Sequence, residues 1–247
     1  MINKIFLIAS LSLILIGCQF TETMVLKEDG SGIMNVEMNM NEMMAFGGMG
    51  MTDSVMVKFD TIIYVKQFLE QKKDSISKLS KEEQNKLRKL ENYMMHVKVN
   101  SETAEMIYDI STSFKNVNEA NDILNGLEQM LNFMPNSEEE LGNPKQEKNS
   151  SDIIGVDYSF EKGVFKRDAY IKDKQLHQQQ VDSLKQSEVF LAGAGYTLKY
   201  TFATPIKRIS DSQANLSSDK KTVILTKSFV DYFKNPDLLD LEVEIEE

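Results

Sequence analysis

Four stretches in which apolar and polar residues alternate constrain this chain most. The clearest stretch covers residues 34–41, with apolar side chains at the even positions up to 40 and polar ones at the odd positions. The others lie at 106–114, 156–161 and 196–203. Neighbouring side chains of a strand point to opposite faces, so each stretch predicts a strand with one buried face. Strands of this kind are typical of antiparallel sheets.

Helical patterns separate these strands. Residues 53–92 are expected to hold two helices, and Ser80 with Glu83 forms an S-x-x-E capping box at the start of the second. Apolar residues at helical spacing over 120–134 and a Gln-rich segment over 174–191 predict two more. The sequence therefore predicts an α+β fold, with an antiparallel sheet built from repeated hairpin–helix units and helices packed on one face.

The first eighteen residues indicate where the protein lives. Lys4 precedes an apolar run over 5–16, and the run ends in Leu15-Ile16-Gly17-Cys18. A membrane-spanning helix needs about 20 apolar residues, whereas the apolar part of a cleaved signal needs about 7–15. The arrangement resembles the bacterial lipoprotein precursors, in which this Cys thiol receives diacylglycerol, the chain is cut before the Cys, and the new amine is acylated.

The resemblance implies that residues 1–17 are a signal peptide and that Cys18 becomes the lipidated N-terminus. Several acyl chains would hold the protein on a membrane of the bacterial cell envelope. Gln19 stands where an Asp would favour the inner membrane, which points to the outer membrane, facing the periplasm or the cell surface. The alternative is an ordinary signal peptide with a stray cysteine.

Composition excludes some partners and sets the size of the fold. The formal net charge of −10 disfavours nucleic acid, which needs clustered Lys and Arg. Cys18 is the only cysteine, so no disulfide is expected within the chain. Residues 18–247 are long enough for a single α+β domain, with a flexible polar loop at 136–151. A division into two domains at that loop is the alternative.

Two short stretches resemble the LppM-type lipoprotein domain, a family of bacterial surface proteins. One is the acidic turn at 27–32, soon after Cys18. The other begins with Tyr200-x-Phe202 and Pro205 and continues through Ser212, Leu216, Asp219 and Thr222-Val223. The resemblance implies an α+β fold and contact with lipids or glycolipids, and it brings no catalytic residue to any position.

Motifs for catalysis or cofactor binding are missing from the sequence. The two histidines, His96 and His177, fall in different expected elements. The chain contains no H-E-x-x-H, C-x-x-C, G-x-S-x-G or P-loop spacing. We therefore expect a protein that is not an enzyme and needs no cofactor.

Methionine is concentrated in one segment. Eight of the fifteen methionines lie between residues 34 and 56. Those at 34–40 suit a strand core, whereas Met43, Met44, Met49 and Met51 lie in a Gly-rich segment expected to be a loop. These four are candidates for flexible contact with an apolar ligand. Thioethers also bind Cu(I), to which residues 94–96 (Met-Met-His) could add.

The sequence thus leaves three functions open for a non-catalytic, membrane-anchored envelope lipoprotein. The first is binding of a lipid or another apolar ligand, in a cleft between layers lined by Tyr196, Tyr200 and Phe202. The alternative is a structural or assembly role beside another envelope protein. The second alternative is periplasmic Cu(I) binding through segment 34–56. The face that carries the three aromatic residues could equally be closed by Leu124, Leu127 and Leu131 and form only a core.

Overall fold

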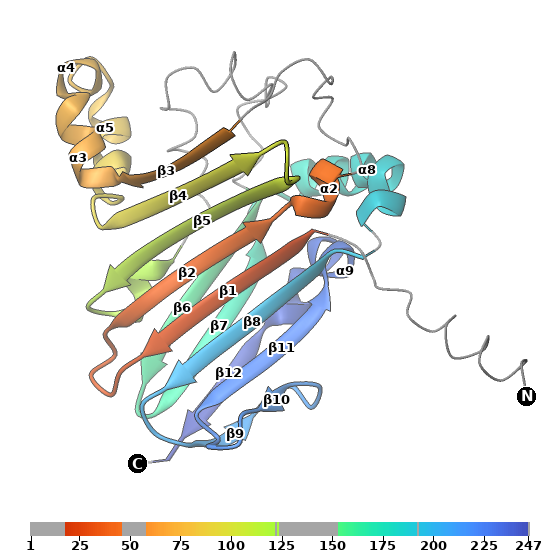
Figure 1. Ribbon diagram of the computed structural model, residues 1–247. Coiled ribbons are helices and arrows are strands. Elements are labelled where there is room, and N and C mark those ends of the chain that lie inside the picture. Colours follow the sequence, from red (N-terminus) through yellow and green to blue (C-terminus); the bar gives the residue numbers. More distant parts are fainter. Residues whose placement is uncertain (1–17, 46–57, 122, 124–152, 192, 247) are drawn as a thin grey trace, which may run out of the picture.

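The computed structural model describes residues 18–45, 58–121, 123, 153–191 and 193–246, and its strands form two sheets (Figure 1). Sheet A has eight strands in the order β10-β11-β8-β1-β2-β5-β4-β3. Sheet B has four in the order β6-β7-β12-β9. The predicted α+β class is confirmed at this level, with sheet as the dominant element.

The strands of sheet A are β1 (Gln19–Leu26), β2 (Gly32–Asn39), β3 (Lys58–Tyr64), β4 (Tyr93–Asn100), β5 (Glu105–Phe114), β8 (Gly195–Phe202), β10 (Asn215–Leu216) and β11 (Thr222–Ser228). Those of sheet B are β6 (Ile154–Glu161), β7 (Val164–Ile171), β9 (Ile206–Ile209) and β12 (Leu241–Ile245). The helices are α2 (Asn41–Ala45), α3 (Val65–Gln71), α4 (Lys73–Ile76), α5 (Lys81–Arg88), α8 (Lys174–Leu191) and α9 (Phe229–Lys234), with 3-10 turns η1 (Val117–Ala120) and η2 (Pro236–Leu239).

Strand β1 lies in the middle of sheet A. It pairs antiparallel with β2, with Gln19 opposite Asn39, and parallel with β8, with Gln19 opposite Gly195. The purely antiparallel sheet predicted from the alternating stretches is therefore wrong at this one pairing. Alternation in a sequence indicates a buried face but does not say which strand will lie alongside.

The turns of the first and third hairpins follow the sequence signals. Gly30 has a φ of +78° and Gly163 has a φ of +73°, a left-handed conformation that favours glycine. The Asp29 carboxylate accepts a hydrogen bond of 3.0 Å from the Ser31 N–H, which closes the first turn. Both turns set the register of their hairpins.

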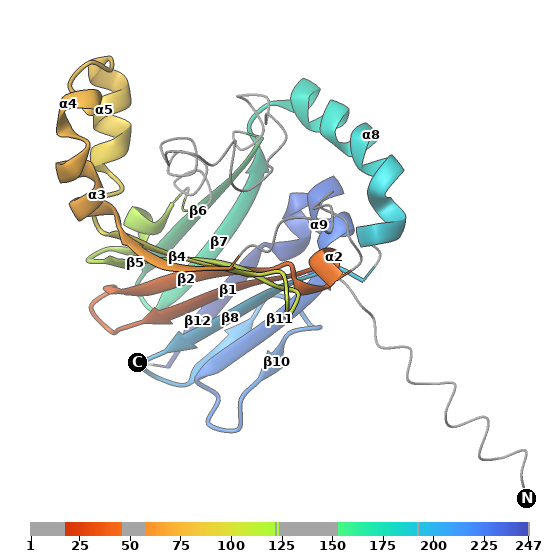
Figure 2. The ribbon, with the colours of Figure 1, turned by 45° about the horizontal axis from the view of Figure 1, so that its top comes forward.

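Sheet B packs on the apolar face of sheet A, and Figure 2 shows β6 and β7 as a separate layer on that side. Phe165 of β7 is fully buried and its ring contacts the rings of Tyr200 and Phe202, at 5.3 and 5.5 Å between centroids. Helix α9 also packs on this face, with 4.9 Å between the ring centroids of Tyr232 and Tyr196. The predicted covering by helices stays a prediction, because most of segment 120–134 lies outside the described residues. Both sheets have one apolar and one polar face, so they bury each other.

The helices lie at the rim of the two sheets. Helices α3 to α5 extend beyond β3, and α8 and α9 lie near the end of the sheet where β1 begins (Figure 2). Each of the three hairpins is followed by a helical segment, namely α2, η1 or α8. The third hairpin belongs to sheet B, and most of the chain between η1 and β6 lies outside the described residues, so the predicted repeat of hairpin–helix units stays a prediction.

The secondary structure of segment 53–92 was predicted only in part. The capping box is confirmed, because the Glu83 N–H donates to Ser80 Oγ and the Ser80 N–H donates to Glu83 Oε2. The first predicted helix begins instead with strand β3, where Ile62 and Ile63 point to opposite faces. Two adjacent isoleucines fit one helix face as well as two strand faces, so this pattern was ambiguous. Most of the helix predicted over 120–134, and the loop at 136–151, lie outside the described residues.

The packing between the sheets makes Phe165 a sensitive position. Phe165→Ala should lower the free energy of unfolding by about 3–5 kcal/mol, because it leaves a cavity between two close-packed layers. Urea denaturation measures the loss. Ile224→Ala on the outer face of sheet A, where the side chain is partly exposed, should cost less than about 1 kcal/mol. Equal losses at the two positions would contradict the packing described here.

Candidate functional site

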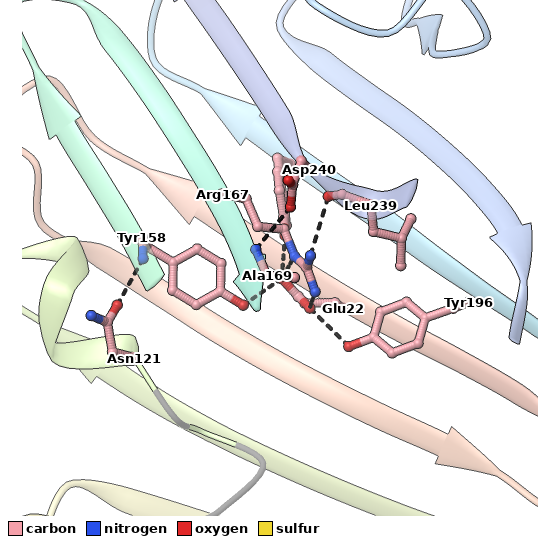
Figure 3. A network of polar contacts seen from close by, with 9 residues as sticks. Glu22, Asn121, Tyr158, Arg167, Ala169, Tyr196, Leu239 and Asp240 are labelled. Atoms are coloured by element: carbon pink, nitrogen blue, oxygen red, sulfur yellow. Dashed lines mark hydrogen bonds and ion pairs between the residues drawn. The ribbon is translucent and has the colours of Figure 1, made fainter. Parts of the chain in front are cut away.

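The most unusual feature of the core is a buried carboxylate on the central strand (Figure 3). Glu22 lies on the apolar face of β1 and is 1 % exposed. Its Oε1 accepts hydrogen bonds from the hydroxyls of Tyr158, at 2.7 Å, and Tyr200, and its Oε2 accepts one from the hydroxyl of Tyr196 at 2.8 Å. Three tyrosines, one from β6 and two from β8, therefore converge on one side chain.

Arg167 of β7 balances this charge from sheet B. Its Nε and Nη2 each donate to one Glu22 oxygen at 3.3 Å, and its Nη1 donates to the Leu239 carbonyl at 3.1 Å. The guanidinium carbon lies 5.7 Å from the centre of the Tyr232 ring. Bidentate pairing with a carboxylate is the geometry that arginine favours, and contact with an aromatic ring adds to it. This ion pair joins the central strands of the two sheets.

The protonation states follow from the cluster. Burial acts to raise the pKa of Glu22, but the charge of Arg167 and the tyrosine hydroxyls outweigh it and the pKa is lowered. Burial and the Glu22 charge raise the pKa of Tyr158, Tyr196 and Tyr200 well above the usual value. Glu22 is therefore ionised and the tyrosines are neutral donors at neutral pH.

Side chains around the cluster form hydrogen bonds with the backbone of β6 and β7 in sheet B. The Asp240 carboxylate accepts a 2.8 Å hydrogen bond from the Ala169 N–H (Figure 3). Asn121 accepts a 2.8 Å hydrogen bond from the Tyr158 N–H and donates one of 3.0 Å to Asp157. Asn121 thus connects the segment after β5 to the first strand of sheet B.

The cluster is a structural site. Five donors already occupy the two oxygens of Glu22, so the carboxylate has no direction left for a substrate or a metal ion. A buried ion pair with all its hydrogen bonds made resists the removal of either partner. Its effect is to hold the two sheets in one relative position.

The residues predicted to line a cleft belong to this core instead. Tyr196, Tyr200 and Phe202 are each at most 2 % exposed. Tyr200 and Phe202 pack against Phe165 of sheet B, and the Tyr196 ring lies 4.9 Å from that of Tyr232 on α9. The cleft prediction is therefore wrong for these three residues, which belong to the core. The predicted closure by Leu124, Leu127 and Leu131 lies outside the described residues. The sequence analysis also missed Glu22 and Arg167. The available signal was a charged residue at an apolar position of each alternating strand, Glu22 between Phe20 and Met24 and Arg167 between Phe165 and Ala169.

The predicted anchor residue lies at the opposite end of β1 from the first turn. Cys18 directly precedes β1, and its carbonyl accepts a 3.1 Å hydrogen bond from the Gly195 N–H. Its side chain is 5 % exposed. Burial raises the pKa of the thiol, with a smaller contribution from the charge of Glu42, whereas a hydrogen bond from the Met43 backbone acts in the other direction. The structure thus brings Cys18 and Met43 together.

Some of the other methionines of segment 34–56 lie in or beside the core, and the rest lie outside the described residues. Met34 is fully buried, and Met38, Met40 and Met44 pack against the core. Met43 and Met44 lie on helix α2 rather than in a loop, which corrects that expectation. Met49 and Met51 lie outside the described residues. The role of Met43, Met44, Met49 and Met51 as ligand residues stays a prediction.

The structure separates the residues that were considered as further copper ligands. Met95 is fully buried in the core, whereas Met94 and His96 point to the outer face of β4. His96 Nε2 lies 2.7 Å from Asp60 Oδ1 on the neighbouring strand. His177 Nε2 is hydrogen-bonded to the Phe233 carbonyl at 2.7 Å. Within the described ranges, no three His, Cys, Asp or Glu side chains are grouped so that they could hold a metal ion.

The outer face of sheet A carries an open groove of about 410 Å³ at the end remote from Cys18. Ile33 and Tyr64 form its apolar walls, and Ser111 and Ser113 of β5 lie between them. Both wall residues are more than half exposed. None of the helices in the described part of the chain is long and apolar enough to span a membrane.

Comparisons with known proteins add little. No family model and no curated protein matches the chain. Among solved structures, the NMR structure of the folded domain of LppM from Mycobacterium tuberculosis is similar, with 7% sequence identity, a TM-score of 0.36, and coverage of 93% of this chain and 89% of that chain. A likeness at this TM-score carries no argument about fold or function, so the LppM-type resemblance depends on the sequence motifs alone.

The ion pair between the sheets predicts a specific pattern of stabilities. Arg167→Met should lower the free energy of unfolding by about 3–5 kcal/mol, because it leaves the Glu22 charge buried without a cation. Combining it with Glu22→Leu should restore part of that loss, because the uncompensated charge is gone. Urea denaturation of the two single variants and the double variant measures both effects. Additive losses would contradict direct coupling.

The same variants give a pH test. The pKa of Glu22 is lower in the folded than in the unfolded chain, so its ionised form stabilises the fold above the usual carboxyl range near pH 4. That contribution is lost as the pH falls through the folded pKa. Between pH 5 and pH 2, the wild type should lose more stability than the double variant. Equal slopes would show that Glu22 does not titrate with unfolding.

Proposed function

We propose that the protein is a non-catalytic lipoprotein of the bacterial cell envelope, anchored through acyl chains on Cys18. The observation that carries this proposal is the position of Cys18 directly before the central strand of sheet A. The hydrogen bond from Gly195 to its carbonyl already belongs to the β1–β8 pairing. An anchor at Cys18 would thus be joined to the sheet without a linker, and the end of the molecule with α2 and α9 would face the membrane.

The surroundings of Cys18 support contact with lipid at this end. Phe20 stacks on Phe229 of α9 with 4.4 Å between the ring centres, and Phe229 lies 6.2 Å from Phe233. All three rings are partly exposed. Met44 of α2 also packs at the edge of the core. Acyl chains leaving Cys18 between β1 and α2 would meet methionine and aromatic side chains, which adapt readily to apolar partners.

The binding role divides into two candidates. Lipid contact at the anchor end is supported by these partly exposed apolar side chains, whereas a lipid carried inside the molecule is not supported by the packed core between the sheets. Assembly with another envelope protein is the second candidate. It is favoured by the groove between Ile33 and Tyr64, because exposed apolar side chains grouped on one face are typical of interaction sites.

The anchor prediction can be tested by mass spectrometry of the protein from its native membranes. The N-terminal peptide should begin at Cys18 and carry the mass of a diacylglyceryl group, because the signal is cut before the modified cysteine. Cys18→Ser should accumulate as an uncut precursor without lipid. An N-terminus at another residue, or an unmodified Cys18, would contradict the proposed function.

The same preparation separates the two binding candidates. Non-covalent lipid retained after detergent exchange, and lost when Phe229→Ser and Phe233→Ser are combined, would support lipid contact at the anchor end. A defined protein crosslinked through the groove, with no retained lipid, would support assembly and overturn lipid contact. The Ile33→Asn variant, which changes only the groove, serves as the matched control for the aromatic positions.

A further inference from the structure

Strand β3 lies at one end of sheet A (Figure 1). Within the described ranges it pairs only with β4, so its other edge, called here the free edge, has no neighbouring strand. Such an edge presents unpaired backbone N–H and C=O groups, which favours pairing with another chain. The sequence of β3, Lys-Phe-Asp-Thr-Ile-Ile-Tyr, is rich in residues that favour strands and contains neither proline nor glycine. This edge is therefore suited to receive an added strand.

The three other end strands among the described residues are short or covered. Strand β10 has two residues, and β9 has four and directly follows Pro205. At the edge of β6, the Asn121 side chain accepts a 2.8 Å hydrogen bond from the Tyr158 N–H. Short strands, proline and covering side chains are common ways to prevent unwanted pairing. Strand β3 has seven residues and only two charged ones, Lys58 and Asp60, both in its first half.

The side chains of β3 leave apolar surface for an added strand. Ile62 and Tyr64 on the outer face are each 51 % exposed. Phe59 and Ile63 on the inner face are only partly buried where they pack against the core. Tyr64 also forms a wall of the groove on the outer face, so the free edge and the groove are one continuous surface. A strand beside β3 would bury apolar side chains on both faces while its backbone pairs.

Strand β4 shows which side chains match those of β3. Opposite the inner face of β3 it places three apolar residues, Met95, Val97 and Val99. Opposite Asp60 it places Lys98. A strand on the free edge would meet the same β3 side chains on the same two faces, because side chains alternate along a strand. The matching segment therefore has apolar residues at alternate positions and a lysine or arginine opposite Asp60, which also suits a chain with a formal net charge of −10.

A second copy of the chain does not fit this edge under the proposed function. The antiparallel pairings β1–β2, β2–β5, β5–β4 and β4–β3 make β3 run in the same direction as β1. Two copies paired antiparallel through β3 would hold their Cys18 residues at opposite ends of the joined sheet, so only one copy could keep its anchor end at the membrane. Parallel pairing through the same edge would join the apolar face of one copy to the polar face of the other.

We propose that β3 accepts an extended segment of a different protein as a ninth strand of sheet A. The segment matches the length of β3, is apolar toward the inner face and carries a basic residue opposite Asp60. This inference deepens the assembly candidate of the proposed function, and the choice of a different protein rests on the anchor at Cys18. Backbone hydrogen bonds supply affinity in this mode of binding, and the alternating side chains supply selectivity.

A synthetic peptide with the sequence of β4, residues 93–100 with both ends blocked, is the probe. It carries the apolar and basic residues at the required positions. Hydrogen–deuterium exchange of the full-length protein, purified in detergent, is measured with and without the peptide. At ten times the Kd of the peptide, the β3 amides that do not bond to β4 should exchange about tenfold more slowly. Amides of β9 and β10 should be unaffected, and a β3 without added protection would overturn the inference.

The charge contact gives a matched control. Asp60→Lys should weaken peptide binding about tenfold, because two lysines then face each other. A peptide with Lys98→Asp should bind this variant about as tightly as the original pair, and it should bind the unchanged protein about tenfold more weakly. Glu28→Lys, the same charge reversal in the exposed first turn, should leave both affinities unchanged. Equal binding of the two peptides to the unchanged protein would overturn the stated partner chemistry.

This inference and the proposed function fail separately, because peptide binding at β3 does not depend on how the N-terminus is processed. Protection of β3 together with an N-terminus other than Cys18 would retain strand addition and refute the anchor. A lipidated Cys18 with no protection of β3 would retain the anchor and refute strand addition. Sedimentation in detergent should show one chain per particle. A dimer that Ile62→Lys separates would show that a second copy covers β3 and would overturn the choice of a different protein.

Discussion

The buried pair between Glu22 and Arg167 is the interaction on which the arrangement of the two sheets depends. It joins the central strand of sheet A to the second strand of sheet B, and three tyrosines complete the shell around the carboxylate. A shift of β1 by one residue would turn Glu22 to the outer face and leave Arg167 buried without a partner. Apolar packing alone would tolerate more than one offset between the layers, whereas this pair favours a single offset.

The same strand links the core to the proposed anchor. Glu22 lies four residues after Cys18. Cys18 directly precedes β1, and residues 19–22 all belong to that strand. A pull on the acyl anchor would therefore act directly on the strand that is held by the ion pair. Under the proposed function, the domain cannot rotate freely about a linker, and its end with α2, α8 and α9 stays near the membrane (Figure 1). The groove beside Ile33 and Tyr64 then faces away from the anchor end.

The sequence predicted local structure better than pairing. The strands at 34–41 and 196–203 and the helix over 174–191 were found at nearly their predicted positions, because alternation and helical spacing are local properties. The parallel pairing of β1 with β8 and the division into two sheets depend on contacts between distant segments, which no local period encodes. Strand β3 was missed because adjacent isoleucines satisfy either pattern.

The candidate sites show the same limit. Glu22 stands on an apolar face in the sequence, but its partner Arg167 is 145 residues away, so the pair could not be found by spacing. Tyr196 and Tyr200 were recognised as members of one face, and only the structure shows that this face packs against sheet B and helix α9. Cys18 and Met43 were each chosen from sequence, yet their contact depends on the β1–β2 register. The prediction of a single domain over residues 18–247 stays a prediction.

Hydrogen–deuterium exchange of the folded protein tests most directly whether the ion pair joins the two sheets into one cooperative unit. The account predicts that amides of β1, β8, β6 and β7 exchange with the same, highest free energy of opening, because neither sheet can open while Glu22 and Arg167 stay buried together. It also predicts that Arg167→Met lowers this value equally in both sheets. Exchange of sheet B at a clearly lower free energy than sheet A would contradict the account and indicate two separately unfolding units.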